Sequence, residues 1–276
     1  MGIALNSASA VFQRIGQSAS AVVLLGAVAV ALAVVNMIVS LIPLVGWIAS
    51  PLVVTPVVSA GTLALAAAIY TRGDFDLSLF VQSVKEYFVP LIGAYLAFGA
   101  AMIGLILIGA IAFTFVVGIS AAAVSSGDPS AAAVSSLGIG GSLFTIAFGV
   151  VIFGALFVFQ FVPVSIVTNG TGVADSFRQS AGVIKANPLS VIGYAVIRQV
   201  FGAIPVGIGV IALAIVGFVI ETGSPGSVTT GAALLGGLLG GLIGIPLQQI
   251  YHVAYFSRAS SQLSQMGSGT HVADRI

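Results

Sequence analysis

Arg198 carries the charge that would be most costly inside a membrane, so it is the first candidate for chemistry in this sequence. It follows Pro188 within an apolar run. In a helix that began at Pro188, at about 1.5 Å per residue, its guanidinium would lie about 15 Å into the bilayer. Such a group would face a polar cavity or pair with an amide, and three glutamines are candidate partners: Gln160, Gln248 and Gln249. In the other interpretation, residues 200–220 span the membrane alone and Arg198 snorkels to the headgroup phosphates.

A second polar group lies close to the end of the last apolar run and contains Gln248, Gln249, Tyr251, His252 and Tyr255. These side chains could line a solute pathway or bind a lipid headgroup. The same composition is typical of a helix that ends at the polar interface, and we prefer this interpretation. The candidate pathway or interface set therefore comprises Arg198, Gln160, Gln248, Gln249 and His252.

The sequence contains no arrangement of residues that suits catalysis or metal binding. It has no cysteine and only two histidines, His252 and His271, so we expect no metal centre. Asp74 and Asp76 are better explained as loop charges, with Asp76 capping the helix that follows. Without a nucleophilic triad or an acid–base pair, we expect no catalytic residue, no cofactor and no enzymatic activity.

The composition is that of a membrane protein. Hydrophobic residues make up 59% of the 276 positions and charged residues 5%, and the mean hydropathy is +1.21. A soluble domain has roughly a quarter of its residues charged. The apolar runs are long and continuous, which favours helices over a transmembrane barrel. The net charge of +1 leaves no basic patch for nucleic acid.

The apolar runs predict an all-α, polytopic bundle of about six spans. We place these spans at about 19–42, 48–70, 89–121, 143–167, within 189–220, and 232–256. Pro51 and Pro56 lie inside the second span and predict a kink or a break. Residues 1–18 form a short interfacial segment, residues 19–256 the transmembrane domain, and residues 257–276 a polar tail that we expect to be poorly ordered.

Two polar stretches between spans predict amphipathic elbow helices, at 71–88 and 175–187. In the second, Phe177, Ala181 and Ile184 fall at helical spacing while Arg178 and Lys185 point away, the pattern of a helix lying in the interface. Both elbows contain Phe-x-Gln-Ser and both lead into Ile-Gly, at 92–93 and 192–193. This match indicates either a weak internal repeat or a coincidence in sequence rich in small residues.

The distribution of charge predicts the orientation. All eight Lys and Arg residues lie in the N-terminal segment, the two elbows, the start of the fifth span or the tail. The loops at 43–47, 125–137 and 221–230 contain none and carry Asp128 and Glu221. By the positive-inside rule, both termini and both elbows are expected on the cytoplasmic side of the cell membrane.

Glycines recur at four-residue spacing in the sixth span, which lets another helix approach closely. We expect this span to be a central packing helix or an oligomer contact through Gly236, Gly237, Gly240, Gly241 and Gly244.

The second elbow resembles a known family. Ala174-Asp175-Ser176-Phe177-Arg178-Gln179-Ser180, followed by Val183-Ile184-Lys185-Ala186-Asn187, is similar to the membrane domain of glycerophosphodiester phosphodiesterases and of six-helix archaeal relatives of unknown function. The sequence departs from these relatives at Asp175 and Gln179, and it lacks the soluble phosphodiesterase barrel. The resemblance implies a fold and a membrane location, and it carries over no catalytic residue.

The sequence therefore predicts a non-enzymatic integral membrane protein that organises the membrane or envelope by packing against lipids or protein partners, with a homo-oligomer as one option. The alternative function is that of a small-solute permease or channel, with Arg198 and the polar end of the sixth span lining its route.

Overall fold

A computed structural model of the chain describes residues 2–43, 45–125, 131–219 and 225–273. Within these ranges all regular structure is helical, which confirms the predicted all-α class. The elements in chain order are α1 (Gly2–Gln17), α2 (Ala19–Ser40), α3 (Val45–Ala49), the π-helical turn η1 (Ser50–Val54), α4 (Thr55–Arg72), α5 (Leu77–Ser125), α6 (Ala131–Asn169), α7 (Val173–Ala186), α8 (Pro188–Val219) and α9 (Pro225–Ala273). Asp128 and Glu221 lie outside the described residues.

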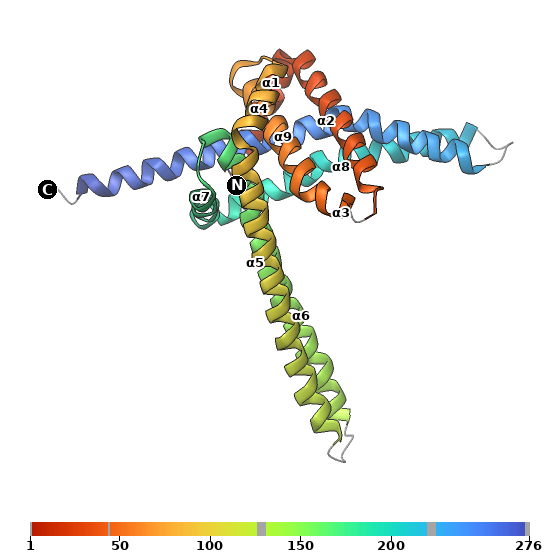
Figure 1. The fold of residues 1–276 in the computed structure, drawn as a ribbon, viewed down its shortest axis with the longest axis vertical. Coiled ribbons are helices and arrows are strands. Elements are labelled where there is room, and N and C mark those ends of the chain that lie inside the picture. The colour runs from red at the N-terminus through yellow and green to blue at the C-terminus, as the bar shows by residue number, and fades with distance from the viewer. Residues whose placement is uncertain (1, 44, 126–130, 220–224, 274–276) are drawn as a thin grey trace.

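Two long hairpins extend from a common core. Figure 1 shows α5 and α6 running side by side away from the other helices, while α8 and α9 leave the core in a different direction. The core lies where α1, α4, the end of α6 and the start of α8 meet α9. Its largest fully buried side chains are aromatic: Tyr194, Tyr251, Tyr255, Phe161 and Phe256.

Four helical stretches in the described part of the chain are long and apolar enough to cross a membrane: Ala19–Ser40, Ser50–Arg72, Leu77–Val116 and Gly140–Asn169. A fifth is possible if α7 and the start of α8, Pro188–Ile204, form one bent span. The sixth predicted span, 232–256, falls within α9 and is not among these. The side chains at its beginning lie outside the described ones.

The second span is broken, as its prolines predicted. The helix changes to a π-helical turn at Ser50–Val54, which contains Pro51, and returns to α-helix at Thr55. Such turns accommodate a residue whose missing N–H interrupts the regular ladder. Ser50 Oγ donates a hydrogen bond of 2.7 Å to Asn36 Oδ1, so the single amide of α2 holds the broken segment against its neighbour.

The first predicted elbow, 71–88, is not a separate helix. After the turn at Gly73, where φ is +82°, the chain enters α5 and continues for 49 residues through Pro90. The backbone N–H of Ser78 donates to Asp76 Oδ1 at 2.8 Å, confirming the cap predicted at Asp76. The elbow does not form a separate helix because Val89, which precedes Pro90, is apolar. Its side chain cannot make a hydrogen bond that would replace those of the helical backbone.

The second predicted elbow is a distinct helix, α7. Gly170 turns the chain with φ +63°, and Asn187 leaves helical geometry at φ −140° just before Pro188. A residue before proline is biased away from helix, and asparagine tolerates such a conformation better than valine. The axes of α7 and of the first part of α8 differ by 103°.

Helix α1 and the first part of the predicted tail pack onto the core more closely than the sequence indicated. Helix α1 buries Ala4 and Val11 against α8 and α9, and the hydroxyl of Tyr251 donates to the Ala4 carbonyl at 3.3 Å. The stretch expected to be a poorly ordered tail continues α9 as far as Ala273. Ala259 in that stretch is fully buried, because the helix there packs on α1 and α7.

Candidate functional site

Arg198 lies on α8 and faces both neighbouring long helices. Its Nη1 donates a hydrogen bond to Gln160 Oε1 on α6 at 3.1 Å. Its backbone carbonyl accepts a weaker contact from Gln248 Nε2 on α9 at 3.4 Å. These contacts join three of the five residues in the candidate set, and His252 is the fourth member of the same cluster.

Two further side chains complete this cluster from one turn away. Tyr194, which precedes Arg198 by four residues on α8, hydrogen-bonds through its hydroxyl to Nδ1 of His252 on α9. Both residues are buried, with 0% of Tyr194 and 4% of His252 exposed. Because i and i+4 share a helix face, Tyr194 and Arg198 point to the same side of α8.

An aromatic layer packs around this pair. The ring of Phe161 on α6 lies 5.1 Å from that of Tyr194 and 5.6 Å from the imidazole of His252, while Tyr194 and Tyr255 stack at 4.5 Å. Ring pairs at such separations contribute about 0.5–1.5 kcal/mol each beyond the area they bury. The layer covers the Tyr194–His252 pair and packs α6, α8 and α9 together.

Gly202 on α8 leaves room for the Gln248 side chain beside Arg198. A Cβ added at Gly202 would lie 2.9 Å from Gln248 Nε2. Gln249, the neighbouring glutamine, is half-buried and makes no hydrogen bond or ion pair with the residues that the structure describes. It therefore does not join the cluster around Arg198.

The charge of Arg198 is met by neutral groups. Among the described residues the one ion pair is between Arg178 and Asp175 on α7, at 3.2 Å, and both of its side chains are largely exposed. Arg198 Nε is buried without a hydrogen-bond partner there, as is Gln160 Nε2. The described residues also contain no group of three or more His, Cys, Asp or Glu side chains that could hold a metal ion. The cluster can therefore hold the Arg198 side chain in place. Among the described residues it contains no carboxylate that could act as a base.

Sequence reasoning missed Tyr194 and Phe161. The spacing of Tyr194 and Arg198 could have indicated the first, because a buried arginine draws hydrogen-bonding side chains to its own helix face. Phe161 gave no such signal. It follows Gln160 in a run of apolar residues in which any aromatic would look the same.

A chain of hydroxyl groups fixes the turn between α6 and α7, next to the cluster. Ser165 Oγ donates to Gln179 Oε1 at 2.5 Å and contacts Thr171 Oγ1 at 2.9 Å. Thr171 in turn contacts Ser176 Oγ at 3.0 Å, and Ser176 donates to the Gly172 carbonyl at 2.6 Å. Ser165 and Ser176 are both fully buried. These hydrogen bonds link the end of α6 to α7 through buried side chains, although Ser180 Oγ and Asn187 Nδ2 at the same elbow are buried without a partner among the described residues.

The glycine-rich part of α9 packs on α2. A Cβ added at Gly241 would lie 3.1 Å from Val30 Cγ2, and Gly236, Gly240 and Gly244 are buried, while Gly237 is partly exposed. The tightest contact comes from a glycine that the spacing argument did not select. A Cβ at Gly26 on α2 would lie 2.0 Å from the carbonyl oxygen of Leu242.

Comparison with known proteins assigns the chain to a family. A family described as "Domain of unknown function (DUF7847)" matches residues 15–259, so the chain belongs to it. The matched range includes both hairpins, the elbow helix α7 and the cluster around Arg198. No curated protein and no solved structure matches the chain.

Proposed function

We propose that this family member is a non-enzymatic, multi-pass membrane protein that organises the surrounding bilayer through its two apolar hairpins. The observation that carries the proposal is a contrast in exposure between the core and the α5–α6 hairpin. The Tyr194–His252 pair is buried in the core, whereas α5 and α6 present apolar side chains outward.

The exposed surface of α5 supports contact with lipid on several sides. At about 1.5 Å per residue its 49 residues extend about 70 Å, more than twice the roughly 30 Å hydrocarbon thickness of a bilayer. Only 6% of the residues in its most apolar 18-residue stretch are buried. Exposed residues at successive positions turn around the helix: Ile103, Ile106, Leu107, Ile108 and Ile111. A helix that is apolar all round and longer than the bilayer must tilt or deform the lipid around it.

The cluster around Arg198 fits a structural role better than a transport route. Tyr194 and His252 are covered by aromatic rings, and the Tyr194 hydroxyl is hydrogen-bonded to Nδ1 of His252. A pathway side chain would need to exchange partners with a passing solute. We therefore assign Arg198 and Gln160 to helix–helix attachment.

One observation favours the alternative, a small-solute permease or channel. Arg198 has no carboxylate partner among the described residues, and its Nε is unpaired there. A buried cation of this kind is a common feature of sites that meet an anionic solute within membranes. In this alternative, Arg198, Gln160 and Gln248 would line the route.

We further propose that both termini and α7 face the cytoplasm, as the positive-inside rule indicates. The likeness of the α7 region to the membrane domain of glycerophosphodiester phosphodiesterases is, in our proposal, a likeness of fold. Membrane lipids are then the principal partners of the chain, with association of copies through α9 as a further option.

Reconstitution tests the proposal against its alternative. Purified protein in vesicles should leave the release of trapped fluorescent anions and cations equal to that of vesicles carrying an unrelated helical protein. It should at the same time lower lipid mobility, measured by spin-labelled acyl chains, in proportion to its amount. Solute flux that is present in the native protein and lost in Arg198→Ala, while Arg178→Ala retains it, would overturn the proposal in favour of a permease.

A further inference from the structure

A polar pocket of about 530 Å³ lies between α1 and α9, away from the cluster around Arg198. One stripe of α1 lines it, through Ile3, Asn6, Ala10 and Gln13 at helical spacing, and Ser9 adjoins them. The facing stripe of α9 contributes Arg258, Ser261, Gln262 and Gln265. Its volume lies within the range of small-molecule sites.

The lining of the pocket carries a positive charge and no negative charge. Arg258 is the one charged residue in its lining, and the rest are amide, hydroxyl or small apolar side chains. Amide NH₂ groups at Asn6, Gln13 and Gln262 are hydrogen-bond donors. No carboxylate lines the pocket, so nothing in its wall neutralises the guanidinium.

The Arg258 guanidinium has an unpaired hydrogen-bond donor. Its Nη1 is covered by protein atoms and has no hydrogen-bond partner within the described residues. The hydroxyl of Ser261 donates to the backbone carbonyl of Arg258 at 2.9 Å, which leaves the guanidinium itself uninvolved. Leaving a covered charged donor unpaired is costly, and a planar guanidinium matches the oxygens of a phosphate group.

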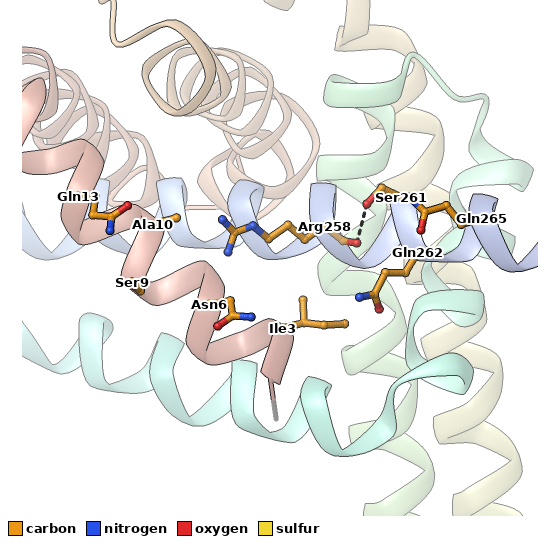
Figure 2. A pocket seen from close by; sticks show the side chains of 9 residues that line it. All are labelled: Ile3, Asn6, Ser9, Ala10, Gln13, Arg258, Ser261, Gln262 and Gln265. Carbon is orange, nitrogen blue, oxygen red and sulfur yellow. Dashed lines mark hydrogen bonds between the residues drawn. The ribbon is translucent and has the colours of Figure 1, made fainter.

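Figure 2 shows how these groups lie. The Arg258 side chain runs along α9 toward the side where Ala10 of α1 lies, and Asn6 and Gln262 point into the space between the two helices. The pocket is therefore lined by donors from two separate helices and by one cation.

The surroundings fit a ligand that comes from the membrane surface. Leu5 and Phe12 on the outer side of α1 are 60% and 59% exposed, so this helix presents apolar side chains outward beside the polar pocket. Arg258 lies two residues beyond buried Phe256, where α9 leaves its apolar stretch. In a membrane, a position just beyond the apolar stretch of a helix would lie near the headgroup phosphates.

We propose that the pocket between α1 and α9 binds a phosphate group, with Arg258 as its cation and Asn6, Gln13 and Gln262 as neutral donors. The phosphate belongs either to an anionic phospholipid headgroup or to a soluble phosphate ester. The inference does not depend on the proposed function, because a permease could hold such a ligand equally well.

Native mass spectrometry of the full-length protein in detergent tests this inference with three probes: phosphatidylglycerol, glycerol 3-phosphate and inorganic phosphate. We expect Arg258→Gln to weaken binding of the preferred probe about tenfold or more, since a charge-assisted hydrogen bond is lost. Arg258→Lys keeps the charge and loses the planar guanidinium. Its affinity for the probe should therefore lie between those of the native protein and Arg258→Gln. Arg178→Gln removes one exposed positive charge from α7 and should bind as the native protein does.

The probes separate the two sources of phosphate. Retention of phosphatidylglycerol alone identifies a lipid site, and binding of glycerol 3-phosphate or inorganic phosphate identifies a soluble ligand. If Arg258→Gln fails to fold, Asn6→Ala and Gln262→Ala should each weaken binding from opposite walls. The inference is overturned if no probe binds the native protein, or if Arg178→Gln weakens binding as much as Arg258→Gln.

Discussion

Nη1 of Arg198 on α8 and Oε1 of Gln160 on α6 are joined by a hydrogen bond of 3.1 Å, across 38 positions of sequence. This bond crosses the corner that α7 forms between the two helices. Because the acceptor is a neutral amide, the bond positions the guanidinium without cancelling its charge. The attachment of α8 to α6 therefore depends on this one side-chain contact and on the aromatic layer beside it.

Replacing the acceptor should destabilise the protein measurably. In Gln160→Leu the Arg198 guanidinium loses its partner in a half-buried setting, at a cost of about 1–3 kcal/mol. Gln249→Leu is the matched control, because Gln249 makes no hydrogen bond with described residues. Denaturant unfolding in detergent measures both, and equal losses in the two variants would show that the bond does not hold the corner.

The contact between α2 and α9 predicts a strong effect of a single methyl group. In Gly26→Ala the new Cβ would lie 2.0 Å from the Leu242 carbonyl oxygen, so the helices must separate. Overpacking of this kind typically costs about 1–3 kcal/mol. At Gly104 on α5 a Cβ meets nothing within 4 Å. Gly104→Ala should therefore be neutral or stabilising by up to about 1 kcal/mol. Equal thermal midpoints for the two variants would contradict the close approach.

The hydroxyl chain at the α6–α7 turn should be sensitive to Ser165. Ser165→Ala leaves Gln179 and Thr171 without their buried partner, with an expected loss of about 1–3 kcal/mol. Thr145→Ala on α6 is the control, because its exposed hydroxyl bonds only to the Gly141 carbonyl of the same helix. Limited proteolysis near residue 170 should speed up in the first variant and stay unchanged in the second.

The cap at Asp76 predicts a pH dependence. Hydrogen bonds from the Ser78 side chain and then from its backbone N–H lower the pKa of Asp76 below its ordinary value of 3.8. A lowered pKa means that the cap stabilises the fold fully above that ordinary value, and that this contribution is lost as pH falls through the folded-state pKa. The thermal midpoint of Asp76→Asn should therefore lie below that of the native protein at pH 6 and converge with it toward pH 3. Asp74→Asn, with no cap to lose, should show no such convergence.

Local signals predicted the parts of the fold that local chemistry decides. Asp76 before an apolar helix, Asn187 before proline, and Pro51 in the second span each act on their own turn of backbone, so the cap, the corner and the break were readable from the sequence. The continuity of α5 was not, because Pro90 is compatible with either a helix break or a helix interior.

The features that the sequence did not predict depend on contacts between distant segments of the chain. The sequence did not indicate that the first part of the predicted tail packs on α1 and α7, where a Cβ built at Gly182 would lie 3.5 Å from Leu263. Gly26 gave no spacing signal, because its partner is a backbone carbonyl 216 positions away. Arg198 was selected by its cost in a membrane, and its spacing from Tyr194 could have indicated that residue, whereas Phe161 became visible only once α6, α8 and α9 were placed together.

Single-cysteine labelling tests the central claim, a multi-pass protein with cytoplasmic termini and a buried core around the Tyr194–His252 pair. The chain has no cysteine, so Asp128→Cys, Asp175→Cys and Ala254→Cys each give one defined thiol. A membrane-impermeant thiol reagent should label position 128 only in intact cells and position 175 only in inverted vesicles. Position 254, fully buried beside His252, should stay unlabelled from either side until the protein is denatured. Reversed labelling at 128 and 175, or labelling at 254 in the native protein, would contradict the account.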